Sequence, residues 1–350
     1  MATRLSRSRL AAGGARRRGV PPRRVAIGIL AGLSVAALAA GCGQAGSSGT
    51  KKETNVKGAG CAPVAGSQLV VLKDDKHLQN SDNIVPAVNA KVASPALIAD
   101  LNKVSAALDT PKLIQLNKQA DVDRVPPQKV AAGFAKTANL TDGVQKGSGS
   151  VTIGAANFSE SKTLAYLYKT VLDAGGFTTS VRTIGNRELY EPALEKGEIQ
   201  VVPEYAATLT EFLNQKANGK NAKPMASPDI DTTMKALTSL GAKDGLKFGE
   251  PSAAADENAF GVTKEFAEKN KVSTLSEFAA KCNGKATILG GPPECPDRAF
   301  CEQGLESKYG MKFGKFVQLD AGGSQSKNGL KTGKVSISLL LSSDAALAGS

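Results

Sequence analysis

The sequence predicts an α/β fold built on largely parallel, doubly wound sheets. Three observations support this prediction: short β-rich runs alternate with helical segments, glycines end the helical segments, and the spacing leaves room for a helix between successive strands. One region carries most of the prediction. Its expected elements are strands at 151–155, 179–183 and 199–202 and helices at 159–174 and 189–196.

Two loops of this region are the first places to look for a binding site. In doubly wound sheets, ligands bind in the crevice beyond the carboxyl ends of the strands. The loops at 156–161 and 203–208 follow two such strand ends. We therefore expect functional side chains in these two loops.

The earlier part of the chain predicts one strand and three helices. The strand is apolar, at 68–73, and has no partner nearby in sequence. The first helix has apolar residues at helical spacing, which marks a buried face. Thr110 and Pro111 read as the cap and first residue of the second helix. The helices are expected at 95–108, 110–119 and 126–135.

The later part alternates in the same way. Thr274 and Glu277 have the spacing of a capping box, which predicts a helix start. The remaining elements are helices at 263–270, 274–281 and 301–309 and strands at 286–290, 316–319 and 335–341.

The front end of the chain predicts export. Residues 1–24 contain eight arginines and no acidic residue, 25–40 are apolar, and small residues precede Cys42. This pattern is that of a secretory signal, and two arginine pairs also permit a twin-arginine route. The sixteen-residue apolar run is short for a membrane span. We expect a signal peptide at 1–41, lipidation of Cys42, and a flexible linker at 42–65 that holds the protein at the outer face of the cell membrane.

Net charge argues against a nucleic-acid partner. The formal charge of +12 falls to +4 when the eight arginines of the signal are removed. The remaining lysines are scattered among acidic residues, and no basic stripe with interleaved aromatics remains.

Cysteine usage fits an oxidising compartment. With Cys42 assigned to lipid, four cysteines remain, and they allow three disulfide pairings. We favour Cys295 with Cys301 and Cys61 with Cys282. Zinc is a weak competitor because the spacings are irregular and the chain has one histidine, so we expect no metal and no cofactor.

Five segments that together cover most of 151–347 carry a family resemblance: IGAANFSES, PALEKGEIQVVPEYAAT, VSTLSEFAA, GGPPECPDRAFCEQGLESKYGMKF and SLLLSSDAAL. They resemble the solute-binding proteins of ABC importers for glycine betaine and other quaternary amines. The resemblance implies a two-lobe clamshell like the type II periplasmic binding proteins, with crossing segments at 250–261 and at a second place that includes 69–73. It also implies a small-molecule solute, permease subunits as partners and a monomeric state.

The order of the resembling segments indicates circular permutation. Residues 68–92 and 101–134 are similar to the end of such a protein, yet they come first here. Permutation is tolerated because chain ends often lie close together. The alternative is that this part is the remnant of a truncated tandem copy. We expect 66–140 to complete lobe A, with 151–250 as the rest of lobe A and 255–350 as lobe B.

The resemblance also implies ligand residues. Family members surround a quaternary ammonium group with tyrosines and bind a carboxylate with arginine, roles that match Tyr205 and Arg298. The motif around Asn157 and Phe158 lacks the lysine and glutamine of the family pattern, Asn258 replaces a tyrosine, and Thr208 follows an alanine instead of a glycine. Glycine betaine itself is therefore one candidate beside choline, carnitine and ectoine.

Each of these residues also has a structural interpretation. Three aromatic residues either replace the family tyrosines that this sequence lacks or simply pack in the core: Phe158, Tyr190 and Phe260. Arg298 either binds a solute carboxylate or pairs with a neighbouring acid. Glu160 is expected in the first turn of a helix, where the helix dipole stabilises an acid, and not as a ligand residue. Residues 342–344 are expected to organise the hinge side of the cleft.

Catalysis is disfavoured. His77 lies in a polar turn without a Gly-x-Ser-x-Gly elbow, and the neighbouring acids Asp256 and Glu257 look like solvated turn charges. We therefore expect a solute-binding component of an importer and no enzyme. The alternative is a lipid-anchored ligand-sensing surface module that is not coupled to transport.

Overall fold

The structure, a computed structural model, describes residues 56–345. All of these belong to one compact unit. The expected signal at 1–41 and Cys42 lie outside the described residues. Within 56–345, no helix is both long enough and apolar enough to cross a membrane.

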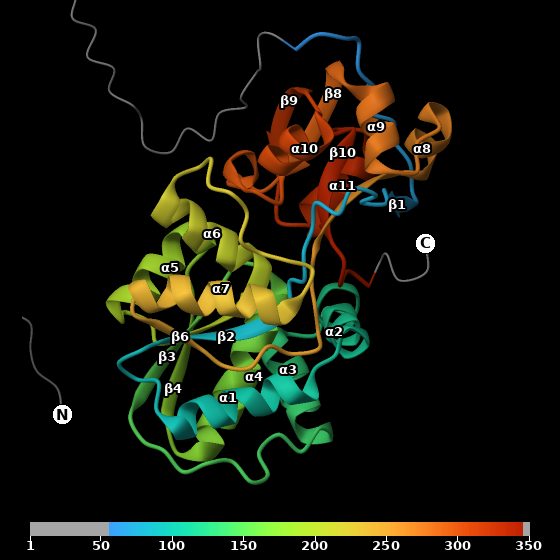
Figure 1. The fold of residues 1–350 in the computed structure, drawn as a ribbon. Helices are drawn as coiled ribbons and strands as arrows, with labels where there is room; N and C mark the ends of the chain where they lie inside the picture. The colour runs from blue at the N-terminus through green and yellow to red at the C-terminus, as the bar shows by residue number, and fades with distance from the viewer. Residues whose placement is uncertain (1–55, 346–350) are drawn as a thin grey trace, which may run out of the picture. The chain divides into compact units, whose positions relative to one another are not determined.

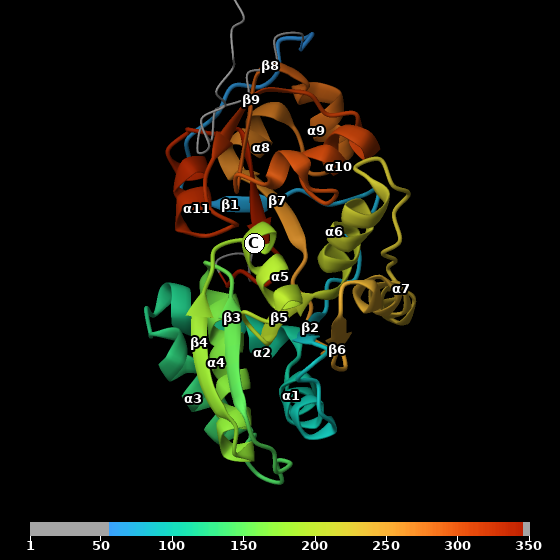
Figure 2. The ribbon, with the colours of Figure 1, turned by 90° about the vertical axis from the view of Figure 1, so that its left-hand side faces the viewer.

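Two five-stranded sheets define two lobes, A and B; lobe B lies above lobe A in Figures 1 and 2. Lobe A has the strand order β4-β3-β5-β2-β6, and lobe B has the order β1-β7-β10-β8-β9. The strands of lobe A are β2 (Ile84–Asn89), β3 (Ser150–Ala155), β4 (Thr178–Thr183), β5 (Val201–Tyr205) and β6 (Leu246–Phe248). Those of lobe B are β1 (Leu69–Val71), β7 (Asn258–Thr263), β8 (Gly284–Gly291), β9 (Phe313–Gln318) and β10 (Ile337–Leu341).

Each sheet has one antiparallel strand in the same place. In lobe A, β3 is parallel to β4 and β5, whereas β2 is antiparallel to β5 and β6. In lobe B, β8 is parallel to β9 and β10, whereas β7 is antiparallel to β10 and β1. The prediction of a parallel sheet was right for three strands of each lobe. It missed the fourth because β2 and β7 enter their sheets from the other lobe.

Helices cover both faces of the lobe A sheet and surround that of lobe B (Figures 1 and 2). One core lies under α1 to α4, where Tyr168 is fully buried, and a second lies under α5 to α7. Lobe A contains α1 (Pro95–Ala107), α2 (Thr110–Asn117), a π-helical turn (Lys118–Val122), α3 (Pro127–Thr137), α4 (Ser159–Gly175), α5 (Arg187–Lys196), α6 (Ala206–Asn218) and α7 (Ile230–Lys243). Lobe B contains α8 (Lys264–Asn270), α9 (Leu275–Cys282), a 3-10 turn (Cys295–Asp297), α10 (Glu302–Tyr309) and α11 (Ser324–Lys331).

Helix boundaries follow local capping chemistry. The capping box of Thr274 and Glu277 is confirmed at the start of α9. At α2 the prediction was wrong by one residue, because the side chain of Asp109 accepts the hydrogen bond from Lys112 N–H and acts as the cap. The expected loop at 203–208 is also wrong: β5 continues to Tyr205 and α6 begins at the next residue.

The first described residues pack on lobe B. Cys61 is disulfide-bonded to Cys282 of α9, and Ala59 bridges to Gly284. Strand β1 then pairs with β7, so the start of the range 66–140 adds a strand to lobe B before the chain crosses to β2. Residues 56–65 of the expected flexible linker are therefore held against the lobe.

Candidate functional site

A cavity of about 660 Å³ lies between the lobes. Lobe A contributes the loop after β3 and the junction of β5 with α6, which is where the sequence placed functional side chains. Lobe B contributes the start of β7 and the loops after β8 and β9. The six residues predicted to bind ligand all line this cavity: Asn157, Phe158, Tyr205, Thr208, Asn258 and Arg298.

Aromatic side chains form one corner of the cavity. The rings of Phe158 and Tyr205 lie 6.2 Å apart between centroids, with their planes inclined at 31°. Tyr190 and, from lobe B, Phe300 also line the cavity. Phe260, the remaining aromatic candidate, is 1% exposed in the lobe B core and is absent from the lining.

A buried polar group, here called the hinge cluster, joins the lobes beneath this corner. It consists of Asn117, Glu160, Tyr205, Asp256 and Ser343. The Glu160 carboxylate accepts hydrogen bonds from Tyr205 Oη at 2.6 Å, Asn117 Nδ2 at 2.5 Å and Ser343 Oγ at 2.7 Å. Ser343 N–H donates to Asp256 Oδ1 at 2.9 Å. Glu160 lies in the first turn of α4, as expected, and also links segments of the two lobes.

Burial shifts the protonation of the carboxyls in this region. It raises the pKa of Glu160 against the opposing effect of the three donors. It also raises the pKa of Asp256 well above its usual range, helped by the nearby Glu160 charge. The interpretation of Asp256 as a solvated turn charge was wrong, since it is 4% exposed.

Asp82 is a third buried carboxyl at the cavity. Its Oδ1 accepts hydrogen bonds from the N–H groups of Ala207 and Thr208 at 2.8 and 3.0 Å, so it caps α6 from outside the helix. Burial nevertheless raises the pKa of Asp82 to about 7.

Arg187 and Glu204 form a buried ion pair at the wall of the cavity. Arg187 donates from Nε and Nη2 to the two carboxylate oxygens of Glu204 at 2.8 and 2.6 Å, and from Nη2 to Thr208 Oγ1 at 2.9 Å. Tyr190 Oη donates to the same carboxylate at 2.9 Å. The predicted residue Thr208 is therefore held by protein groups on both its N–H and its hydroxyl.

Arg298 is also engaged by protein. Its Nε and Nη2 donate to the two carboxylate oxygens of Glu188 at 2.9 and 3.0 Å, across the cleft from lobe B to α5 of lobe A. The guanidinium carbon lies 5.5 Å from the centre of the Phe212 ring. Neither Asp297 nor Glu302, its neighbours in sequence, is the partner in this bidentate pair.

Further polar contacts cross the cleft near Arg298, and we call this set the mouth contacts. They comprise Arg298 with Glu188, Lys220 with Asp297, Asn186 with Glu294 and Gln215 with Gln303. The disulfide between Cys295 and Cys301 closes the lobe B loop that carries two of these residues, Asp297 and Arg298. Asn258 supports the same loop, because its Nδ2 donates to the Phe300 carbonyl at 3.0 Å.

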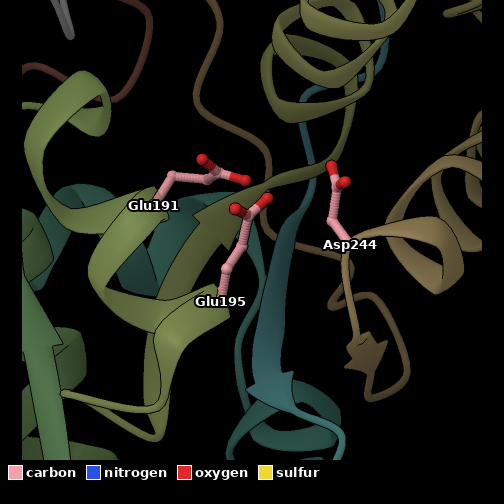
Figure 3. A group of neighbouring side chains, drawn as sticks. All are labelled: Glu191, Glu195 and Asp244. Atoms are coloured by element: carbon pink, nitrogen blue, oxygen red, sulfur yellow. The ribbon is translucent and has the colours of Figure 1, made fainter.

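One group of carboxylates outside the cleft has the spacing of metal ligands. Within residues 56–345 it consists of Glu191, Glu195 and Asp244, whose carboxylates face one another in Figure 3. The ammonium of Lys216 hydrogen-bonds to all three. Burial raises the pKa of Glu191 to about 8. The ammonium of the protein's own Lys216 already pairs with all three carboxylates, so we assign no metal to this group.

Sequence reasoning missed most of the charged residues of the cleft. Asp82, Arg187, Glu188 and Glu204 lie in ordinary polar surroundings in the sequence, and their roles depend on partners from other elements. A partial signal exists for Arg187 and Glu188, which follow Gly185 at a point where a strand end meets a helix start.

Comparison with known proteins identifies the family. The profile of the substrate binding domain of ABC-type glycine betaine transport systems matches residues 62–137 and 149–349, which is more than half of the chain. A search of curated proteins finds no match. Among solved structures, the crystal structure of a glycine betaine/carnitine/choline ABC transporter has 22% sequence identity and a TM-score of 0.35, covering 57% of this chain and 71% of that one. On the strength of the profile match, the chain belongs to this substrate-binding family and is the extracytoplasmic solute-binding component of an ABC importer.

Proposed function

We propose that the cleft captures a solute with a quaternary ammonium group and delivers it to a permease. The observation that carries this proposal is the aromatic corner of Phe158 and Tyr205, in a cavity that Glu211, Glu294 and Asp320 also line. A quaternary ammonium group donates no N–H hydrogen bond, so proteins hold it with aromatic faces and nearby negative charge. The cavity volume is within the usual range for small-molecule sites.

Tyr205 has two separable functions in this proposal. Its ring contributes one face of the corner, and its hydroxyl donates to Glu160 in the hinge cluster. The ring would contact the ammonium group, while the hydroxyl would hold that ring in place. Burial raises the pKa of Tyr205 well above its usual range, so the hydroxyl stays a donor at physiological pH.

Membrane attachment and chain order complete the proposal. Export with lipidation of Cys42 would hold a monomeric binding protein near its permease, and the basic, apolar and small-residue pattern of the front end supports this. Circular permutation is supported by the matching strand orders of the two sheets, in which β1 and β2 come first in sequence yet complete sheets formed mainly by later strands.

The ring and the hydroxyl of Tyr205 can be tested separately. We expect Tyr205→Ala to weaken binding of a quaternary amine by about tenfold or more, because a desolvated cation–π contact contributes up to about 2 kcal/mol. Tyr205→Phe keeps the ring and should retain affinity within about threefold, although it loses the bond to Glu160. Binding is measured by titration calorimetry and by the ligand-induced rise in melting temperature, with choline, glycine betaine and carnitine as probes.

The decisive outcome is the behaviour of the alanine variant. If folded Tyr205→Ala protein binds these probes as tightly as the parent, Tyr205 does not hold the solute. If the parent protein binds no quaternary amine at all, the proposed solute class is wrong.

A further inference from the structure

The bidentate pair of Arg298 and Glu188 leaves little for a solute carboxylate to bind. A guanidinium presents a planar fork of N–H donors that matches one carboxylate through two parallel bonds. Here Nε and Nη2 of Arg298 make both of these bonds to Glu188. The Phe212 ring lies near the guanidinium and further fixes its position.

Exchange of Glu188 for a solute carboxylate would gain little. A carboxylate that displaced Glu188 would form the same two bonds that it broke. Glu188 would lose its guanidinium partner at the edge of a cleft that already contains several acids. Burial works to raise the pKa of Glu188, but the Arg298 charge and hydrogen bonds outweigh it and lower the pKa, so the carboxylate is held charged in the pair.

The second arginine of the cleft is committed in the same way. Arg187 makes its bidentate pair with Glu204, which is almost completely buried. The described residues that line the cavity include no lysine and no other arginine. Both cations of the lining are therefore neutralised by glutamates of lobe A.

The acids of the lining have no such counterparts. Among the described residues, no salt bridge involves any of the five other carboxyls that line the cavity; their hydrogen bonds come from backbone N–H groups, hydroxyls and amides. At pH values where even some of them are ionised, the cavity carries a net negative charge. These residues are Asp82, Glu211, Asp256, Glu294 and Asp320.

We propose that Glu188 determines specificity by occupying Arg298, so that the cleft selects a quaternary ammonium cation without a carboxylate over a zwitterion with one. This inference rests on the proposed function, because it assumes that the ammonium group binds in the aromatic corner. A cation with a hydroxyl or short neutral tail meets the uncompensated acids, whereas the carboxylate of a zwitterion meets acids and two arginines already in use. Glu188 thus acts as an internal competitor for the carboxylate subsite.

Choline and glycine betaine form a matched pair of probes, since they share a trimethylammonium head and differ in the group at the other end. We expect the parent protein to bind choline at least about tenfold tighter than glycine betaine in titration calorimetry. Glu188→Ala frees Arg298 and should tighten glycine betaine by about tenfold, the value of one charge-assisted pair, without tightening choline. The matched control is Glu306→Ala, which removes the glutamate of another exposed ion pair, with Lys312, and should change neither affinity.

A double variant shows whether the gain passes through Arg298. In a Glu188→Ala background, Arg298→Ala should remove the gain in glycine betaine affinity. The proposal is overturned if the parent binds glycine betaine as tightly as choline, or if Glu188→Ala leaves the ratio of the two affinities unchanged. Both results leave quaternary amine binding intact. Absence of binding to either probe would instead refute the proposed function, and the specificity inference with it.

Discussion

The two ends of the interface between the lobes use similar polar side chains but differ in exposure. Every member of the hinge cluster is less than a tenth exposed, and Glu160 alone accepts three hydrogen bonds there. At the mouth, the side chains of Lys220 and Asp297 are 72% and 57% exposed, and those of Arg298 and Glu188 are 20% and 39% exposed.

This difference indicates where the lobes can separate. A buried donor or acceptor that loses its partner costs about 1–3 kcal/mol, whereas an exposed ion pair contributes about 0–1 kcal/mol. Opening at the mouth therefore requires much less free energy than opening at the hinge cluster. The geometry favours a rotation of the lobes about the hinge cluster. Water would replace the mouth contacts when the lobes separate, and these contacts would form again when the lobes close.

The largest expected effect comes from breaking the hinge cluster. We expect Glu160→Ala to lower the free energy of unfolding by about 3 kcal/mol, because Tyr205 Oη loses its buried acceptor and Asn117 and Ser343 lose one of theirs. Relief of the repulsion between Glu160 and Asp256 offsets part of this loss. Chemical denaturation monitored by circular dichroism measures the difference. A variant as stable as the parent would show that the cluster contributes nothing to holding the lobes.

A smaller effect should appear as a pH dependence from Asp82. Its pKa of about 7 in the folded protein lies above the ordinary value of 3.8, so the folded state holds the proton more tightly. The stabilisation is complete below about pH 4 and is lost as pH rises through 7, which amounts to about 1 kcal/mol between pH 6 and 8. Asp82→Asn keeps the oxygen that caps α6, and it should lose that much less stability over this interval.

Denaturation curves of the parent and Asp82→Asn proteins at pH 6, 7 and 8 measure this difference. Glu160 and Asp256 also have raised pKa values and should give both proteins a common residual slope. Parallel pH profiles of the two proteins would mean that Asp82 does not titrate in this range.

The smallest effect is expected at the mouth. Lys220→Ala removes one exposed ion pair and should change stability by less than about 0.5 kcal/mol. Denaturation of the parent and Lys220→Ala proteins at low and high salt measures this change, because salt screens an exposed ion pair. A loss above 1 kcal/mol would contradict the view that the mouth is the weak end of the interface.

Local signals in the sequence explain which parts of the fold were predictable. Helix α4 was predicted almost to the residue because an apolar stripe ends at glycines, and Gly176 takes a left-handed conformation at its C-cap (φ 99°) that favours glycine. The antiparallel strand β2 and the immediate start of α6 were not predicted. Both depend on pairing with distant segments: β2 with β5, and Asp82 with the first turn of α6.

The site divides in the same manner. Tyr205 and Arg298 could be located at the cavity from motif resemblance, since their motifs are contiguous in sequence. Their partners could not be inferred, because Glu160 and Glu188 reach them across 45 and 110 positions of the chain. Charged residues such as Asp256 look alike in sequence whether they are solvated or buried, and only the fold distinguishes the two.

If the proposed lipidation of Cys42 tethers the chain, the disulfide between Cys61 and Cys282 has a mechanical consequence. Any tension on the chain before residue 61 reaches α9 through a covalent bond instead of peeling β1 from the edge of its sheet. Lobe B would then be the fixed body, and lobe A would be the lobe that moves. If a reductant cleaved this bond, the three-residue backbone pairing of β1 with β7 would have to bear the tension.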